Sequence, residues 1–124
     1  MSYRVGDKGP GDGIVFYTEG GKYKECSGEL GEYDWDTAIK MAQNFRGGGF
    51  SNWHLPNKDE LDLMYQNLSL KGLGGFDTSG DTGLYWSSSE YETGYAWFQN
   101  FNSGFQANAI GNDTPCRVRA VRAF

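Results

Sequence analysis

Apolar and polar positions change their spacing along the chain, and each change predicts a different element. Residues 14–17, Ile-Val-Phe-Tyr, form a short apolar run after a cluster of turn residues, which is typical of a buried strand. Glycines at positions 20 and 21 can close a hairpin, so residues 23–26 are expected to return as a second strand. The N-terminal part of the chain therefore predicts a β-hairpin.

From residue 34 onward the apolar residues recur at intervals of three and four, the spacing of one helical face. This stripe runs from Trp35 to Phe45. Asp34 or Asp36 can cap the N-terminus, and three consecutive glycines at 47–49 are expected to end the helix. The pattern predicts a first helix between these two signals.

A second helix is predicted after Pro56, which cannot continue a helix upstream. Asn57 and Glu60 have the spacing of a capping box, with asparagine in place of the usual serine or threonine. The apolar stripe that follows consists of Leu61, Met64, Tyr65 and Leu68.

The last third of the chain begins with a loop at residues 72–83. Short strands are expected around residues 85–88, 95–101 and 117–122, joined by long irregular connections. Two helices among short strands and long ordered loops predict an α+β fold, in one domain over residues 1–124.

Between about residues 92 and 116 many side chains follow neither the period of a buried strand nor that of a helix. Large aromatics scattered among Gly, Asn and Ser resemble the composition of antibody paratopes, in which Tyr supplies contact area and small polar residues adapt their hydrogen bonds. Trp97 and Phe101 are assigned to the core. The predicted ligand-binding positions are Thr93, Gly94, Tyr95, Phe98, Phe105, Ala107, Ala109, Ile110, Gly111, Asn112 and Asp113.

Composition and charge narrow the classes of partner. The 124 residues include 19 Gly, 8 Tyr, 8 Phe and 4 Trp, which suits a loop-rich domain packed around aromatics better than a helix bundle. A net charge of -5 argues against nucleic acid or an anionic membrane as partner. No apolar run is long enough to insert into a bilayer, and residues 1–4 do not begin a signal peptide. Either the protein stays where it is made, or an exporting segment lies outside this sequence.

Few residues offer catalytic or metal-binding chemistry. Cys26 and Cys116 are interpreted as free thiols, with a single disulfide as the less favoured alternative. His54 is the only histidine, and no serine or cysteine has a context that would activate it, so we expect no enzyme and no cofactor. Four aspartates could suggest calcium but lack the spacing of a calcium loop, and we expect no metal there: Asp7, Asp12, Asp77 and Asp81.

Several blocks of sequence together resemble a known family. They are residues 5–7 with 13–17, 36–38, 53–61, 85–91 with 96–97, and 117–122, and they include the Trp-His-Leu-Pro and Tyr-Trp-Ser-Ser segments. They resemble the family named for the C-terminal domain of the collagen-like bacterial adhesin. The resemblance implies a C-type-lectin-like fold and suggests a cell-surface or secreted location. His54 stands where an arginine is usual in that family.

A subset of proteins with this fold serves as the variable protein of diversity-generating retroelements. In those systems adenine-directed mutagenesis rewrites asparagine codons, and randomising the two adenines of AAC cannot produce Lys, Glu, Gln, Met or Trp. All eleven predicted ligand-binding positions satisfy this restriction, whereas Glu92 does not and is excluded. The resemblance therefore implies a hypervariable face that binds a protein or glycan ligand.

Two alternatives remain open. An invariant adhesin module could bind a sulfated polysaccharide through Arg117, Arg119 and Arg122, although a strand whose arginines pair with the surplus acids is the preferred interpretation. A structural or assembly module within a larger surface protein is the third reading.

Overall fold

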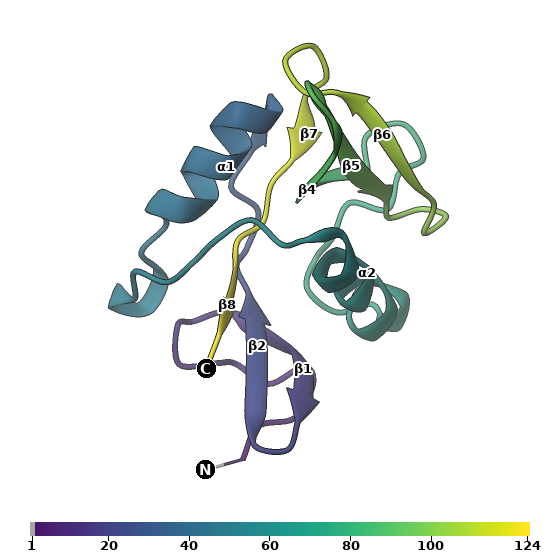
Figure 1. Cartoon of the computed structure of the whole chain (residues 1–124). Coiled ribbons are helices and arrows are strands. Elements are labelled where there is room, and N and C mark those ends of the chain that lie inside the picture. The colour runs from purple at the N-terminus through teal and green to yellow at the C-terminus, as the bar shows by residue number, and fades with distance from the viewer. Residues whose placement is uncertain (1) are drawn as a thin grey trace.

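The computed structural model describes residues 2–124, which fold into two β-sheets and two α-helices (Figure 1). This arrangement confirms the predicted α+β class. The first sheet has the order β1-β2-β8, and its strands are β1 (Ile14–Glu19), β2 (Lys22–Cys26) and β8 (Val121–Ala123). The second has the order β3-β7-β4-β5-β6, and its strands are β3 (Glu32–Tyr33), β7 (Cys116–Arg117), β4 (Leu84–Glu92), β5 (Tyr95–Asn100) and β6 (Gln106–Ile110).

Both predicted helices are confirmed, and their caps explain where they begin. Helix α1 (Trp35–Asn44) starts after Asp34, whose side chain accepts a hydrogen bond from the Thr37 amide at 3.3 Å. Helix α2 (Lys58–Asn67) starts with a complete capping box between Asn57 and Glu60. Within residues 2–124 no helix has the length and apolar character needed to cross a bilayer.

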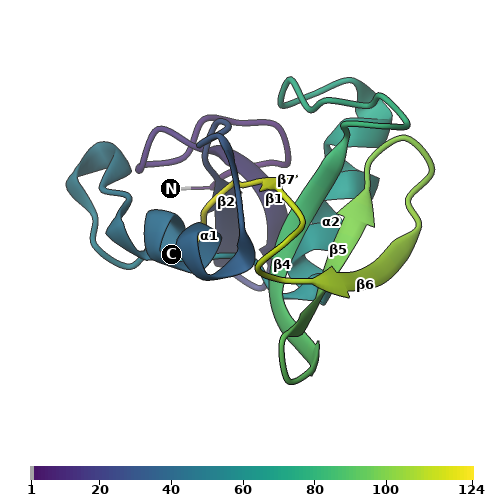
Figure 2. The same cartoon turned by 90° about the horizontal axis from the view of Figure 1, so that it is seen from above.

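The five-stranded sheet separates two hydrophobic clusters. Adjacent residues on β4 point to opposite faces, so Tyr85 packs with Met64 of α2, whereas Trp86 packs with Ala38 and Ala42 of α1. Figure 2 shows α2 against one face of β4 and β5, with α1 on the other side. The two helices thus hold β4 and β5 from both faces and leave β6 at the edge of the sheet.

A buried ion pair joins the glycine-rich N-terminal turn to the last strand. The Glu25 carboxylate on β2 is fully buried and accepts hydrogen bonds from the amides of Gly11 and Gly13. It also accepts from Arg122 Nε on β8 at 2.8 Å, and Arg122 is only 4% exposed. Both oxygens of the Glu25 carboxylate thus accept hydrogen bonds from the N-terminal turn or from β8. The buried pair therefore connects the N-terminal turn and the last strand to β2.

The prediction of a single strand over residues 117–122 is wrong. The structure divides it into β7 and β8, which belong to different sheets. Residues 118–120 between them are buried, and the Val118 amide bonds to the Gly31 carbonyl. The chain crosses the interior here, so Val118, Arg119 and Ala120 are all buried although they belong to neither strand.

Strand β6 was also missed, because residues 106–110 were interpreted as irregular. The strand pairs with β5 in an antiparallel register that runs from Gln99 opposite Gln106 to Tyr95 opposite Ile110. From Ala107 onward the strand alternates: Ala107 and Ala109 are half-buried, and Asn108 and Ile110 are exposed. The alternation is weak in sequence because the inward side chains are only methyl groups on an edge strand.

Candidate ligand-binding site

The two faces of β5 have different surroundings, which decides where each predicted position points. Ala96 belongs to the cluster around α1, whereas the buried Gln99 donates to Asp62 of α2 at 2.9 Å. Because side chains alternate along a strand, Ala96 and Phe98 share the α1 side. Tyr95 shares the α2 side with Gln99.

The eleven predicted positions therefore do not form one continuous face. Tyr95 and Ile110 lie opposite each other on the α2 side of the β5–β6 pair. Phe98, Ala107 and Ala109 lie on the α1 side, and Phe98 and Ala109 pack against the α1 cluster.

Exposure divides the same positions in a second way. The side chain of Phe105 is 67% exposed and that of Ile110 is 42% exposed. Gly111 is buried. The half-buried positions are Tyr95, Phe98, Ala107 and Ala109, and the other exposed positions are Thr93, Gly94, Asn112 and Asp113.

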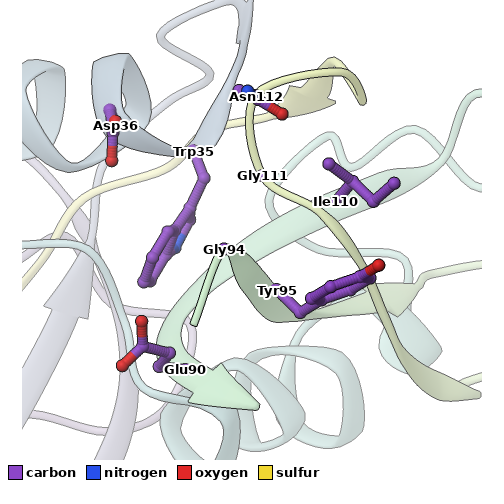
Figure 3. Close-up of a pocket in the computed structure, with 8 residues that line it drawn as sticks. All are labelled: Trp35, Asp36, Glu90, Gly94, Tyr95, Ile110, Gly111 and Asn112. Atoms are coloured by element: carbon purple, nitrogen blue, oxygen red, sulfur yellow. The ribbon is translucent and has the colours of Figure 1, made fainter. Parts of the chain in front are cut away.

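Five of the predicted positions meet at one pocket of about 380 Å³, which we call the hairpin pocket (Figure 3). It lies where the turn between β4 and β5 and the end of β6 approach the start of α1. The lining residues are Trp35, Asp36, Glu90, Gly94, Tyr95, Ile110, Gly111 and Asn112. In Figure 3 the Trp35 ring and the Glu90 carboxylate lie on one side of Gly94, and Tyr95 and Ile110 lie on the other.

Backbone hydrogen bonds hold the lining segments together. The Gly111 amide donates to the Gly94 carbonyl at 2.9 Å, and the Trp35 amide donates to the Gly111 carbonyl at 2.8 Å. The Trp35 indole Nε1 donates to the Ser87 carbonyl at 2.8 Å, which fixes the ring. These bonds use main-chain atoms at Gly94 and Gly111, so the positions of the segments do not depend on the side chains displayed beside them.

Gly111 itself is constrained although it was predicted to bind ligand. A Cβ atom at this position would lie 3.0 Å from Trp35 Cβ, which is closer than side chains normally pack. A larger residue would therefore have to move Trp35. Gly111 supports the pocket by close approach and supplies no side chain to a ligand.

Sequence reasoning missed three lining residues. Trp35 and Asp36 were interpreted as part of the helical stripe and as a possible cap, and Glu90 as part of the rigid frame around β4. The sequence carries no signal for them, because only the folding of α1 beside the β4–β5 turn brings them to the pocket.

The assignment of Trp97 to the core is wrong, whereas that of Phe101, which is 1% exposed, is confirmed. Trp97 is half-buried and lies at the surface on the same side of β5 as Tyr95. Its ring has Lys58 Nζ 4.3 Å from its centroid and the Tyr91 ring 5.5 Å away, edge to face. Strand alternation places Trp97 away from α1, which a run of apolar residues alone does not reveal.

The three C-terminal arginines are engaged within the molecule. Arg117 forms ion pairs with Glu29, Glu32 and Asp77. Arg122 pairs with Glu25 as described above. Arg119 is 3% exposed, and its guanidinium carbon lies 3.9 Å from the centroid of the Phe76 ring. The preferred interpretation, arginines paired with acids, is confirmed for Arg117 and Arg122.

Neither thiol is available as a nucleophile in the folded chain. Both cysteines are buried and unbridged. Burial raises the pKa of the Cys26 thiol to about 11 and that of the Cys116 thiol to about 12. Within residues 2–124 no three His, Cys, Asp or Glu side chains gather in a way that could hold a metal ion. Asp77, one of the aspartates considered for calcium, accepts from the Ser79 amide and the Thr82 hydroxyl and pairs with Arg117.

Comparison with known families identifies the group to which this architecture corresponds. The family model of the Lcl C-terminal domain matches residues 18–122, which is most of the chain. The chain belongs to the Lcl C-terminal domain family. The match covers α1, α2 and all of the second sheet, so the hairpin pocket lies inside the Lcl C-terminal domain. None of the curated proteins compared matches the chain.

Proposed function

We propose that this protein is a ligand-binding domain with a C-type-lectin-like scaffold, and that it serves as the variable protein of a diversity-generating retroelement. Its ligand-binding region is the hairpin pocket together with the exposed positions next to it. The ligand is a protein or a glycan, and binding involves no covalent chemistry.

One observation carries the proposal. Gly94, Tyr95, Ile110, Gly111 and Asn112 come from two separate segments of the chain, and the fold brings them to one pocket. All five have residue types that adenine-directed mutagenesis of asparagine codons can produce, and in the sequence they follow neither a strand nor a helix period. Their convergence is what a diversified recognition surface requires.

The scaffold also supports side-chain exchange at these positions. Backbone hydrogen bonds connect Gly94 to Gly111, and Gly111 to the Trp35 amide. The five-residue register between β5 and β6 is likewise made by main-chain atoms. Such bonds are independent of side-chain identity, so exchange at Tyr95 or Ile110 changes the surface before it changes the fold.

The absence of catalysis is part of the proposal. It is supported by the two buried thiols with raised pKa values and by the single histidine, His54, whose backbone pairs with Val121 at a distance from the pocket. The polysaccharide-binding alternative has less support, because Arg117 and Arg122 are already paired with carboxylates and Arg119 is buried.

A pair of displayed libraries tests the proposal. The first randomises Tyr95, Phe105, Ile110, Asn112 and Asp113 with adenine-substituted AAC codons. The control library applies the same codons to five frame positions: Tyr85, Trp86, Ala96, Phe101 and Val118. Both are sorted on the yeast surface for folded display and then for binding to a panel of unrelated proteins and glycans.

We expect most members of the first library to stay folded and to yield binders to several targets, and most of the control library to be lost. Equal loss of folded display in both libraries would refute the proposed display of variable side chains. The retroelement is tested separately by sequencing the flanking DNA for a near-copy of the codons for residues 85–124 with AAC codons at the variable positions.

A further inference from the structure

We propose that the hairpin pocket binds the cationic group of a protein ligand, the ammonium of a lysine or the guanidinium of an arginine. Trp35 forms the aromatic wall of the site, and Asp36 and Glu90 supply its negative charge. This inference rests on the proposed binding function and names the chemistry of its ligand.

The first observation is the composition of the wall. Trp35 is half-buried and its only indole donor is used by the Ser87 carbonyl, so the ring meets a ligand as an aromatic surface. Aromatic rings attract ammonium and guanidinium groups through their negative π face, and Trp does so best. The same molecule already uses this contact at Trp97, where Lys58 Nζ lies 4.3 Å from the ring centroid.

The second observation is the charge of the lining. Asp36 and Glu90 both line the pocket, and neither forms an ion pair or side-chain hydrogen bond within residues 2–124. No lysine or arginine is among the lining residues. Lys40 lies one helical turn after Asp36 but is not paired with it. The pocket therefore combines an aromatic wall with two uncompensated carboxylates, which favours a cation over an anion.

Several acids elsewhere in the molecule are neutralised by ion pairs, whereas those near the hairpin pocket are not. Glu25, Glu60 and Asp77 are each paired with a basic side chain. Like Asp36 and Glu90, Glu92 and Asp113 have no basic partner within the described residues, and they flank the lining segments in sequence. The negative charge at this end of the molecule is thus left available to a ligand, within a chain of net charge -5.

A neutral sugar is the competing ligand, because sugars also stack on Trp and donate hydroxyl hydrogen bonds to carboxylates. The two differ in their response to charge. A cation loses affinity when a carboxylate becomes an amide and when salt rises, whereas a neutral sugar keeps hydrogen bonds to an amide and is insensitive to salt.

Nuclear magnetic resonance titration of the isotope-labelled protein separates these cases. The probes are Nα-acetyl-lysine amide, the uncharged Nα-acetyl-norleucine amide of matched shape, and methyl β-glucoside. The signals followed are the Trp35 indole Nε1–H and the amides of Gly94, Tyr95 and Asn112. The variants are Asp36→Asn, Glu90→Gln and, as a control for net charge alone, Asp81→Asn in the exposed loop before β4.

We expect saturable shifts with the lysine probe and binding of the norleucine probe at least fivefold weaker. Asp36→Asn and Glu90→Gln should each weaken the lysine probe by about two- to fivefold, and Asp81→Asn should leave it unchanged. Preference for methyl β-glucoside, equal binding of norleucine, or equal effects of all three variants would overturn the cation assignment. In those outcomes the proposed function is tested separately, with a variant recovered from the first display library and the target that it binds. If the target shifts the same signals in that variant, the proposed function stands without the cation assignment.

Discussion

Phe98 and Phe105, which have the same predicted role, test which of the predicted ligand-binding positions are exposed to solvent. Phe98 and Phe105 were both predicted to bind ligand. In the structure Phe98 is half-buried against the α1 cluster, with its ring centroid 6.5 Å from that of Trp86, whereas Phe105 is 67% exposed. Replacing each with alanine removes the same atoms from two different environments.

The expected losses follow from burial. Phe→Ala at a fully buried site costs about 3–5 kcal/mol, so half burial of Phe98 gives about 1.5–2.5 kcal/mol. With only a third of its side chain covered, Phe105 should contribute less than about 1 kcal/mol. At about 3–5 °C per kcal/mol for a chain of this length, Tm should fall by about 5–12 °C for Phe98→Ala and by less than about 5 °C for Phe105→Ala.

Urea denaturation followed by tryptophan fluorescence and by circular dichroism measures both changes. Phe101→Ala, at a residue that is 1% exposed, gives the fully buried reference and should cost the most. The order of loss should be Phe101, then Phe98, then Phe105. If Phe105→Ala destabilises as much as Phe98→Ala, the Phe105 side chain is packed in solution and is not an exposed ligand-binding position.

Three further outcomes follow from the packing and the pKa shifts. Glu25→Gln leaves the buried Arg122 guanidinium without its counter-charge and should lower the free energy of unfolding by about 3–5 kcal/mol in urea denaturation, and a loss below 1 kcal/mol would contradict the buried pair. Hydrogen bonds from Ser79 and Thr82 lower the pKa of Asp77 from 3.8 to about 2. The ionised carboxylate therefore stabilises the fold fully above pH 4, and this contribution is lost as the pH falls through 2. Asp77→Asn should flatten the acid limb of the profile of stability against pH in this window. Cys26 and Cys116 should react with a disulfide reagent at pH 8 only after unfolding, and rapid labelling of the native protein would show that they are not buried.

Local sequence signals were sufficient where a few neighbouring residues decide the structure. The caps at Asp34 and Asn57 are made with residues three positions away, so the sequence predicted the start of α2 at Asn57 and narrowed that of α1 to Asp34 or Asp36. The β1–β2 hairpin is likewise decided by its own turn. The sequence predicted the ends of helices less accurately. Helix α1 ends at Asn44, before the glycines at 47–49 that were expected to end it.

Prediction failed where distant segments decide the outcome. Whether residues 117–122 form one strand depends on β2 and β4, which pair with different parts of this segment. The pocket was found only in part, because Trp35 and Glu90 reach it through the docking of α1 beside the β4–β5 turn. Residue type and spacing do not predict how such distant segments dock.

The position of β6 explains why the ligand-binding face that we propose is smaller than the one expected from the sequence. As an edge strand it pairs only with β5, and its side chains on the α1 side are two alanines, so it contributes little to the core. Substitutions at Ile110 or Asn112 therefore meet solvent and the hairpin pocket. Phe98 lies on β5, which both helices hold, and a substitution there changes packing as well as surface. For the function we propose, side-chain exchange without loss of the fold is thus least costly at the β4–β5 turn and at Phe105, Ile110, Asn112 and Asp113, because main-chain bonds set the geometry there.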